Sequence, residues 1–355
     1  RVADELERLL ASDAIKGMPR LEAVYLLGAL RARLQQPAAA EAVAQALTRP
    51  GVPAYAGVRQ EHLAAVAACI RATVIHEDNG SLLRADSIIS EVEPALRAIP
   101  SLSVRFRCLG VQARIKQSIG QHEDSVRIYQ EVIRLADDTE APWRRSSARS
   151  GLAYTLYRAG QLEPAGRYND EAKKISSEAE DWWALSEVMT TEAILLTDAG
   201  QTAKELAALT GAIDYARKAG AVRDEALGLA NLSDFYLHQA DYPRAYQIAQ
   251  RAVPLARSLR QVSTENLANL NSGLALISMH RLDEGMALIK PGLEHERASN
   301  DLASLKESTS DVARYLEKAG YLAEAFTMYR SLRGLTSEIA LRDQQEAVLE
   351  LQEGF

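Results

Sequence analysis

Histidine and cysteine are the side chains in this sequence that could bind a metal ion or act as nucleophile and base, so we consider them first. The histidines form neither an HExxH pair nor a metal-ligand spacing with a cysteine, and they lie far apart, at His62, His76, His122, His238, His280 and His295. The sequence also lacks a GxxxxGK[ST] phosphate loop and a GxGxxG turn. These observations predict no catalytic residue, no metal and no cofactor.

The two cysteines, Cys69 and Cys108, fall near the same point of neighbouring repeat units, described below, and could lie close together. Two interpretations are open: a bonded pair, or two small buried apolar residues, which is the commoner use of cysteine in such a setting. We favour the second interpretation. The redox state of the pair is left open.

Small residues recur along the chain every forty residues, most clearly around Leu152 to Ala172. One column contains the expected turn residues Gly80, Gly120, Gly160, Gly200, Ala240, His280 and Gly320. A second column lies five residues later, at Ala85, Ser125, Ala165, Glu205, Ala245, Gly285 and Ala325. A third lies seven residues before the turn, at Thr73, Ala113, Ala153, Ala193, Ser233, Gly273 and Ala313.

This spacing predicts repeated pairs of helices, each closed by a turn at the first column. The two other columns place small side chains where the paired helices meet, which lets their backbones approach closely. We expect seven such hairpins from His62 onward. Before them we expect a capping helix in 2–15 and a degenerate pair in 21–35 and 38–47.

With 47% of its 355 residues hydrophobic and 25% charged, the chain has the composition of a globular protein that can bury a substantial core. Glycine and proline are scarce while alanine, leucine, glutamate and arginine dominate, which favours helix. The net charge of -7 argues against nucleic acid as a partner, since that needs a basic stripe. The sequence contains no run of eighteen apolar residues, so we predict no membrane insertion. The chain begins at Arg1, which suggests a piece of a longer protein.

The columns resemble the tetratricopeptide repeat (TPR), which has small residues at its eighth, twentieth and twenty-seventh places and a glycine near its fifteenth. The likeness covers about residues 20 to 333, and the sequence departs from the pattern at Asn169 and Glu205. The resemblance implies an all-α, right-handed superhelical solenoid of about seven TPR-like hairpins. The expected domains are a cap in 1–20, the solenoid in 21–333 and a C-terminal helix in 334–355.

In the fold that the chain resembles, a concave groove is lined by the first helix of each pair, one and four residues after the small residue. The resemblance therefore assigns the groove to Arg114, Gln117, Tyr154, Tyr157, Ile194, Thr197, Asp234, Leu237, Leu274, Ile277, Arg314 and Glu317. An apolar floor beside tyrosine and arginine is typical of a protein or peptide recognition surface. The alternative is that the C-terminal helix covers Leu274 and Ile277. Trp182 and Trp183 are assigned to packing between repeats, with recognition as the alternative.

The end of the chain has a helical seam, Leu341, Val348, Leu351 and Phe355, with charged residues between its members. Glu338 and Arg342 are spaced to pair on the outer face of this helix. The segment resembles the linker between TPR sensor regions and the output domain of bacterial GGDEF-type diguanylate cyclases, or of related sensor kinases. That resemblance implies a homodimer through this helix and a place on the periplasmic face of the inner membrane. The alternative is a plain capping helix.

Together these features predict a non-catalytic sensory or protein-interaction module of a bacterial signalling protein. Its expected partner is a protein or peptide in the concave groove, without nucleic acid. The alternative is a cytoplasmic peptide receptor or scaffold with no output enzyme.

Overall fold

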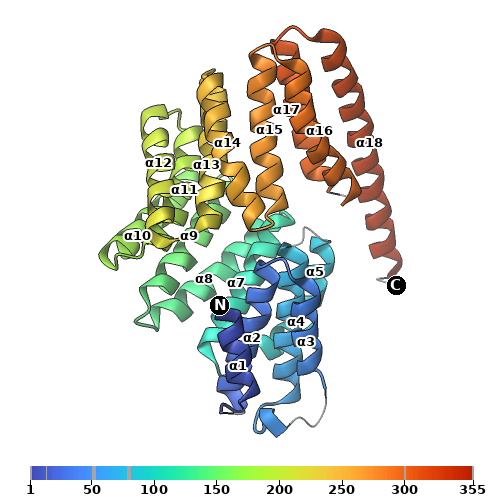
Figure 1. Cartoon of the computed structure of the whole chain (residues 1–355). Coiled ribbons are helices and arrows are strands. Elements are labelled where there is room, and N and C mark those ends of the chain that lie inside the picture. Colours follow the sequence, from blue (N-terminus) through green and yellow to red (C-terminus); the bar gives the residue numbers. More distant parts are fainter. Residues whose placement is uncertain (1, 13, 50–52, 78–80, 300, 354–355) are drawn as a thin grey trace. The chain divides into compact units, whose positions relative to one another are not determined.

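A computed structural model describes residues 2–12, 14–49, 53–77, 81–299 and 301–353, with the side chains of 342, 343 and 345–353 left out (Figure 1). Within this part of the chain the structure is helical and contains no strand. The chain divides into two compact units, Arg1–Ala219 and Gly220–Phe355. None of the helices described is long and apolar enough to cross a membrane.

The first unit contains a cap, a first helix pair and four hairpins. Its elements are α1 (Val2–Ala11), α2 (Gly17–Arg33), α3 (Pro37–Leu47), the short 3-10 helix η1 (Pro53–Tyr55), α4 (Gln60–Glu77), α5 (Leu82–Ser90), α6 (Glu93–Arg97), α7 (Leu102–Ser118), α8 (His122–Asp137), α9 (Pro142–Arg158), α10 (Leu162–Glu178), α11 (Trp182–Asp198) and α12 (Thr202–Ala219). Figure 1 shows successive helices running back and forth beside one another.

The second unit contains three hairpins. They are formed by α13 (Val222–His238) with α14 (Tyr242–Ser258), α15 (Val262–Ser278) with α16 (Leu282–Ala298), and α17 (Leu302–Lys318) with α18 (Leu322–Glu353). With the four hairpins of the first unit that begin at α4, α7, α9 and α11, the described residues contain the seven that the forty-residue spacing predicts. The prediction of an all-α solenoid of helical hairpins is confirmed.

The turns inside these hairpins need a left-handed backbone at the predicted positions. Gly120, Gly160, Gly200 and Gly320 have φ between 65° and 87°. Ala240 and His280 occupy the same place with φ of 57° and 60°, although a left-handed residue with a Cβ costs roughly 1–2 kcal/mol. The turn column is therefore confirmed at these six positions, and Gly80 lies outside the described residues.

The second and third columns lie directly opposite each other inside a hairpin. The Ser125 hydroxyl donates to the Ala113 carbonyl at 2.8 Å, and the Ser233 hydroxyl donates to the Ala245 carbonyl at 2.8 Å. In α15 and α16 both positions are glycine: a Cβ on Gly285 would lie 2.6 Å from the Gly273 carbonyl oxygen. At the contact between α15 and α16, only a very small side chain fits where the two backbones meet.

We therefore predict that Gly285→Ala destabilises the second unit. The new methyl group would press on backbone atoms, so the free energy of unfolding should fall by about 1–3 kcal/mol, although alanine is the better helix former. The matched control is Gly334→Ala in α18, where a Cβ meets nothing within 4 Å, and this change should stabilise by roughly 0.5–1 kcal/mol. Denaturant unfolding measures both; equal effects would contradict the proposed contact.

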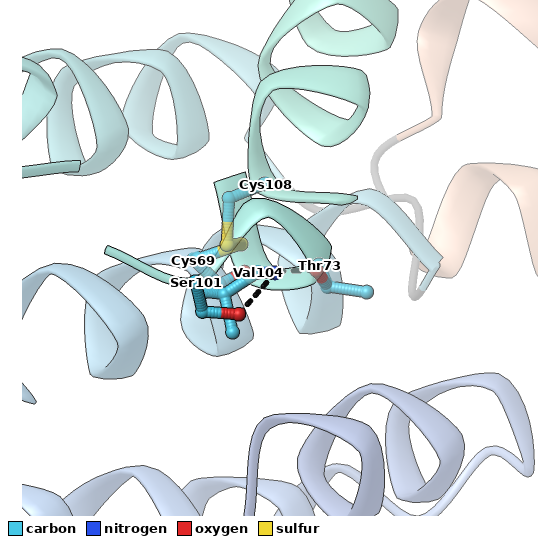
Figure 2. Close-up of a disulfide and its surroundings, with 5 residues drawn as sticks. All are labelled: Cys69, Thr73, Ser101, Val104 and Cys108. Carbon is cyan, nitrogen blue, oxygen red and sulfur yellow. Dashed lines mark hydrogen bonds between the residues drawn. A yellow bond between two sulfur atoms is a disulfide. The ribbon is translucent and has the colours of Figure 1, made fainter. Parts of the chain in front are cut away.

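The interpretation of Cys69 and Cys108 as unbonded apolar residues is wrong. They form a disulfide between α4 and α7, with Cα atoms 5.7 Å apart, and both side chains are fully buried (Figure 2). Local hydrogen bonds fix the helices nearby: the Thr73 hydroxyl donates to the Cys69 carbonyl at 2.8 Å, and Ser101 Oγ accepts from the Val104 N–H at 3.2 Å. The equivalent positions in neighbouring repeats thus meet in space.

Reducing this disulfide should destabilise the first unit. The bond closes a loop with a sequence separation of 39, and loop closure alone restricts the unfolded chain by about 4 kcal/mol. Denaturant unfolding with and without dithiothreitol measures the difference. The double variant Cys69→Ser/Cys108→Ser is the control and should be insensitive to reductant; a reductant effect of the same size in that variant would contradict the assignment.

The C-terminal helix is continuous with the last hairpin, since α18 runs without a break from Leu322 to Glu353. Leu341 is 56% exposed, whereas the side chains of its predicted seam partners lie outside the described residues. Glu338 accepts from Arg297 of α16 at 2.7 Å, and the Arg342 side chain is also outside the described part. This helix therefore begins as a packed part of the solenoid.

Candidate binding surface

The residues assigned to the groove lie on the first helices of the hairpins: α7, α9 and α11 in the first unit, and α13, α15 and α17 in the second. Neighbouring first helices contact each other within each unit, as α7 does with α9 and α15 with α17. A side chain on such a helix either packs against the next first helix or faces away from it, and the structure separates the two groups.

The predicted apolar floor of the second unit does not exist. Leu237, Leu274 and Ile277 are 2%, 2% and 0% exposed and belong to one core cluster with Ile289 and Val312. Their positions after the small residue are used for packing between neighbouring helices, so these three assignments are wrong. Residues of the second unit's own hairpins bury them, including Ala325 near the start of α18.

The remaining groove residues of the second unit are exposed charges that are already paired. Asp234 lies 3.3 Å from Nδ1 of His238, and Arg314 lies 2.5 Å from Asp311. Glu317 accepts a hydrogen bond from the Tyr329 hydroxyl at 2.6 Å. This surface is polar, and its charged side chains are largely neutralised by one another.

In the first unit, Gln117 is also buried, at 8% exposure, so its assignment to the groove is wrong. Its Oε1 accepts from the Thr155 hydroxyl at 3.0 Å, and Thr155 in turn lies 3.2 Å from the Ser125 hydroxyl. A buried amide that makes such bonds holds α7, α8 and α9 together rather than meeting a ligand.

Tyr154 and Tyr157 of α9 remain accessible at this face. Both are partly buried, and their rings stack with centroids 6.1 Å apart. Burial and the nearby Asp198 carboxylate raise the pKa of the Tyr157 hydroxyl. Two preordered tyrosines offer a large contact area at little cost in side-chain entropy.

The groove residues predicted on α11 offer less surface for a ligand. Ile194 is partly buried, and Thr197 is exposed with its hydroxyl donating to Glu205 at 2.7 Å. Glu205, which departs from the small-residue column, is thus used inside its own hairpin. Trp182 stacks on Tyr215 of α12 with ring centroids 5.8 Å apart, so this contact lies within its own hairpin, and the predicted packing between repeats stays a prediction.

A cluster of three arginines, Arg107, Arg114 and Arg144, lies on the same two first helices, α7 and α9. The sequence analysis predicts only Arg114 of these as a binding residue. Arg107 precedes Arg114 by seven residues on α7, which places both on one helix face, and Arg144 lies at the start of α9. The arginines at i and i+7 were the available signal. It was missed because the TPR pattern directs attention only to the positions after the small residue.

Aromatic rings hold two of these guanidinium groups. Arg107 lies 4.8 Å and Arg144 5.1 Å from the ring centre of Trp143. Phe106 meets Trp143 edge-to-face at 5.6 Å. Each contact is a cation–π or aromatic interaction of about 0.5–1.5 kcal/mol, which favours a defined arrangement of the cluster.

Arg107 and Arg144 form no ion pair among the described residues, whereas Arg114 lies beside the Tyr129 hydroxyl, which is also close to the negative charge of Glu187. Burial lowers the pKa of Arg107, the nearby Tyr25 opposes that shift, and the positive charges of Arg33 and Arg144 lower it further. Arg33 itself has an acidic neighbour, Glu77, at 3.8 Å. Arg107 and Arg144 therefore concentrate positive charge that no described ion pair neutralises.

Several other basic side chains of the first unit are paired with carboxylates. Arg71 makes a two-pronged contact with Glu41 at 3.0–3.1 Å, and Lys116 lies 2.8 Å from Asp86. Arg149 lies 2.9 Å from both Asp137 and Glu171. The described residues contain no group of three or more histidine, cysteine or acidic side chains placed to bind a metal ion.

No protein-family model and no curated protein sequence matches this chain. Solved structures do match in fold. The apo form of RapI is 15% identical with a TM-score of 0.60, covering 78% of this chain and 98% of its own. A STAND-type signal transduction ATPase with a tetratricopeptide repeat sensor, from Pyrococcus horikoshii, is 14% identical with a TM-score of 0.55, and the match covers 90% of this chain and 54% of that one.

The fold is TPR-like. NprR in complex with its cognate peptide NprX is a further TPR-like match, 11% identical with a TM-score of 0.51, covering 89% of this chain and 99% of that one.

The comparisons do not show the predicted resemblance to diguanylate cyclases. The predicted place on the periplasmic face of the inner membrane is wrong, because it followed from that resemblance, and the matching TPR-like structures are RapI and NprR instead.

A histidine at the edge of the second unit gives a pH-dependent prediction. Asp234 hydrogen-bonds His238 and raises its pKa, while partial burial and Arg314 oppose the shift. Because the folded pKa is raised, the pair stabilises the protein fully below the ordinary histidine pKa, and this contribution disappears as pH rises through the raised value. An NMR titration of His238 should show a raised pKa that Asp234→Asn lowers. Asp283→Asn is the control; a pKa equally sensitive to both changes would contradict the pairing.

Proposed function

We propose that this chain is a protein- or peptide-interaction module of a regulatory protein, and that its ligand contacts the first helices α7 and α9 of the first unit. The observation that supports this proposal is that two first helices in contact, α7 and α9, contain both the stacked Tyr154 and Tyr157 and the three arginines Arg107, Arg114 and Arg144. Tyrosine, tryptophan and arginine are the side chains that contribute most binding energy at protein interfaces.

The fold supports a peptide or protein as the ligand class, since NprR, with a similar fold, has been solved with its cognate peptide. An open face of paired helices exposes several side chains along its length, which suits an extended or helical segment better than a small molecule that needs an enclosing pocket. The proposal therefore assigns recognition, and no chemistry, to this chain.

The output of the module is a separate matter. A peptide receptor or scaffold without an output enzyme is as compatible with the solved structures of similar fold as a sensory input region is. Nothing favours a cyclase as the output domain. Exposed Leu341 on α18 supports a homodimer through this helix as a further proposal.

The proposal is tested with a synthetic peptide array that samples acidic, basic and apolar compositions. The purified chain should bind a subset of these peptides. The double variant Tyr154→Ala/Tyr157→Ala should bind them at least about tenfold more weakly, because it removes two aromatic contacts of the kind that dominate interfaces.

Leu162→Ala is the matched control, since Leu162 is an exposed apolar residue on the second helix α10. It should leave peptide affinity unchanged in fluorescence polarisation. A peptide affinity that is unchanged by the tyrosine substitutions, or the absence of any peptide binding, would overturn the proposal.

A further inference from the structure

The chain as a whole is acidic, with a net charge of -7, yet its first unit brings together the partly buried Arg107 and Arg144, which form no ion pair among the described residues. Gathering Arg107 and Arg144 near Arg33 costs free energy, because like charges repel and burial removes water. The Nε atoms of Arg107 and Arg144 are shielded from solvent and lack a hydrogen-bond partner in the described part of the chain. A group that supplied negative charge here would relieve these costs.

The cluster is also preordered. Trp143 lies within 5.1 Å of both Arg107 and Arg144, so neither side chain has to give up much freedom when a ligand binds. The guanidinium group has a planar fork of donors that matches a carboxylate through two parallel hydrogen bonds. The hydroxyl of buried Tyr129 lies near Arg114, which limits the positions of that guanidinium group.

We propose that Arg107, Arg114 and Arg144 recognise the carboxylates of an acidic peptide segment, an inference that rests on the proposed function and names the chemistry of its ligand. Arg107 and Arg114 are two helical turns apart, or about 10 Å at 1.5 Å per residue. Acidic residues three positions apart in an extended polyproline-type segment are separated by about 9 Å and point to the same side. Two carboxylates with this spacing would reach both arginines.

An acidic peptide fits this surface better than a nucleic acid does. Binding to a nucleic-acid backbone requires a basic stripe along many phosphates, whereas here the positive charge is local and the chain carries a net negative charge. Tyr154 and Tyr157 lie further along α9, where they would pack on apolar parts of the same segment.

The test compares fluorescent peptides that differ only in charge. One peptide contains two glutamates three positions apart, and its partner contains glutamines at the same places. Fluorescence polarisation with the full chain should show at least about tenfold tighter binding of the acidic peptide, with the difference shrinking as NaCl rises.

Variants assign the preference to named residues. Arg107→Ala and Arg114→Ala should each weaken binding of the acidic peptide by about tenfold or more and leave the amide peptide unchanged. Arg107→Lys should retain part of the affinity, since it keeps the charge but loses the fork. Arg167→Ala is the matched control, because Arg167 lies on the second helix α10 and is paired with Glu163 at 2.6 Å. Circular dichroism on heating should show each variant folded.

The outcomes separate the two proposals. Equal binding of the acidic and amide peptides, with loss in the Tyr154→Ala/Tyr157→Ala variant, overturns the acidic preference and leaves the peptide-interaction function standing. Failure of every peptide overturns both. Tighter binding of a single-stranded oligonucleotide than of the acidic peptide overturns this inference in favour of a phosphate ligand.

Discussion

The structure depends on how closely two helix backbones approach inside each hairpin. Where Gly273 faces Gly285, a single methyl group would collide with a carbonyl oxygen, and where Ser125 faces Ala113, a hydroxyl bridges the gap. This approach fixes the helices of a pair relative to each other and buries the larger side chains at its flanks. The same requirement, repeated every forty residues, produces the columns in the sequence.

Packing at this distance determines which side chains remain for recognition. The first helices also contact one another, so their short and branched side chains are used in the core, as Leu274 and Ile277 are. Side chains long enough to extend past this contact remain near solvent. The arginines of α7 and α9 and the tyrosines of α9 belong to this second group, and Trp143 keeps two of the arginines in place.

Periodicity predicted the fold well because turns and close helix contacts restrict residue type locally. Gly120 and Gly160 are needed by the backbone, and such needs are visible in one sequence. The surface was predicted less well because it depends on distances between helices. The sequence position of Gln117 does not reveal whether its side chain is exposed to solvent or hydrogen-bonded to Thr155. Nor does the sequence reveal that Arg107 and Arg144 both contact the ring of Trp143. The sequence places the two cysteines at equivalent positions of neighbouring repeats. Only their distance in space shows whether they form a disulfide or are merely close together.

The bond between Cys69 and Cys108 also has a mechanical consequence. If the chain were stretched from its two ends, the segment between these residues, with α5 and α6 inside it, would stay closed, because force would pass through the sulfur atoms instead of the backbone. A sequence separation of 39 corresponds to about 130 Å of fully extended chain. The oxidised protein, when fully stretched, would be shorter than the reduced protein by about this length. Reduction of the disulfide would release it.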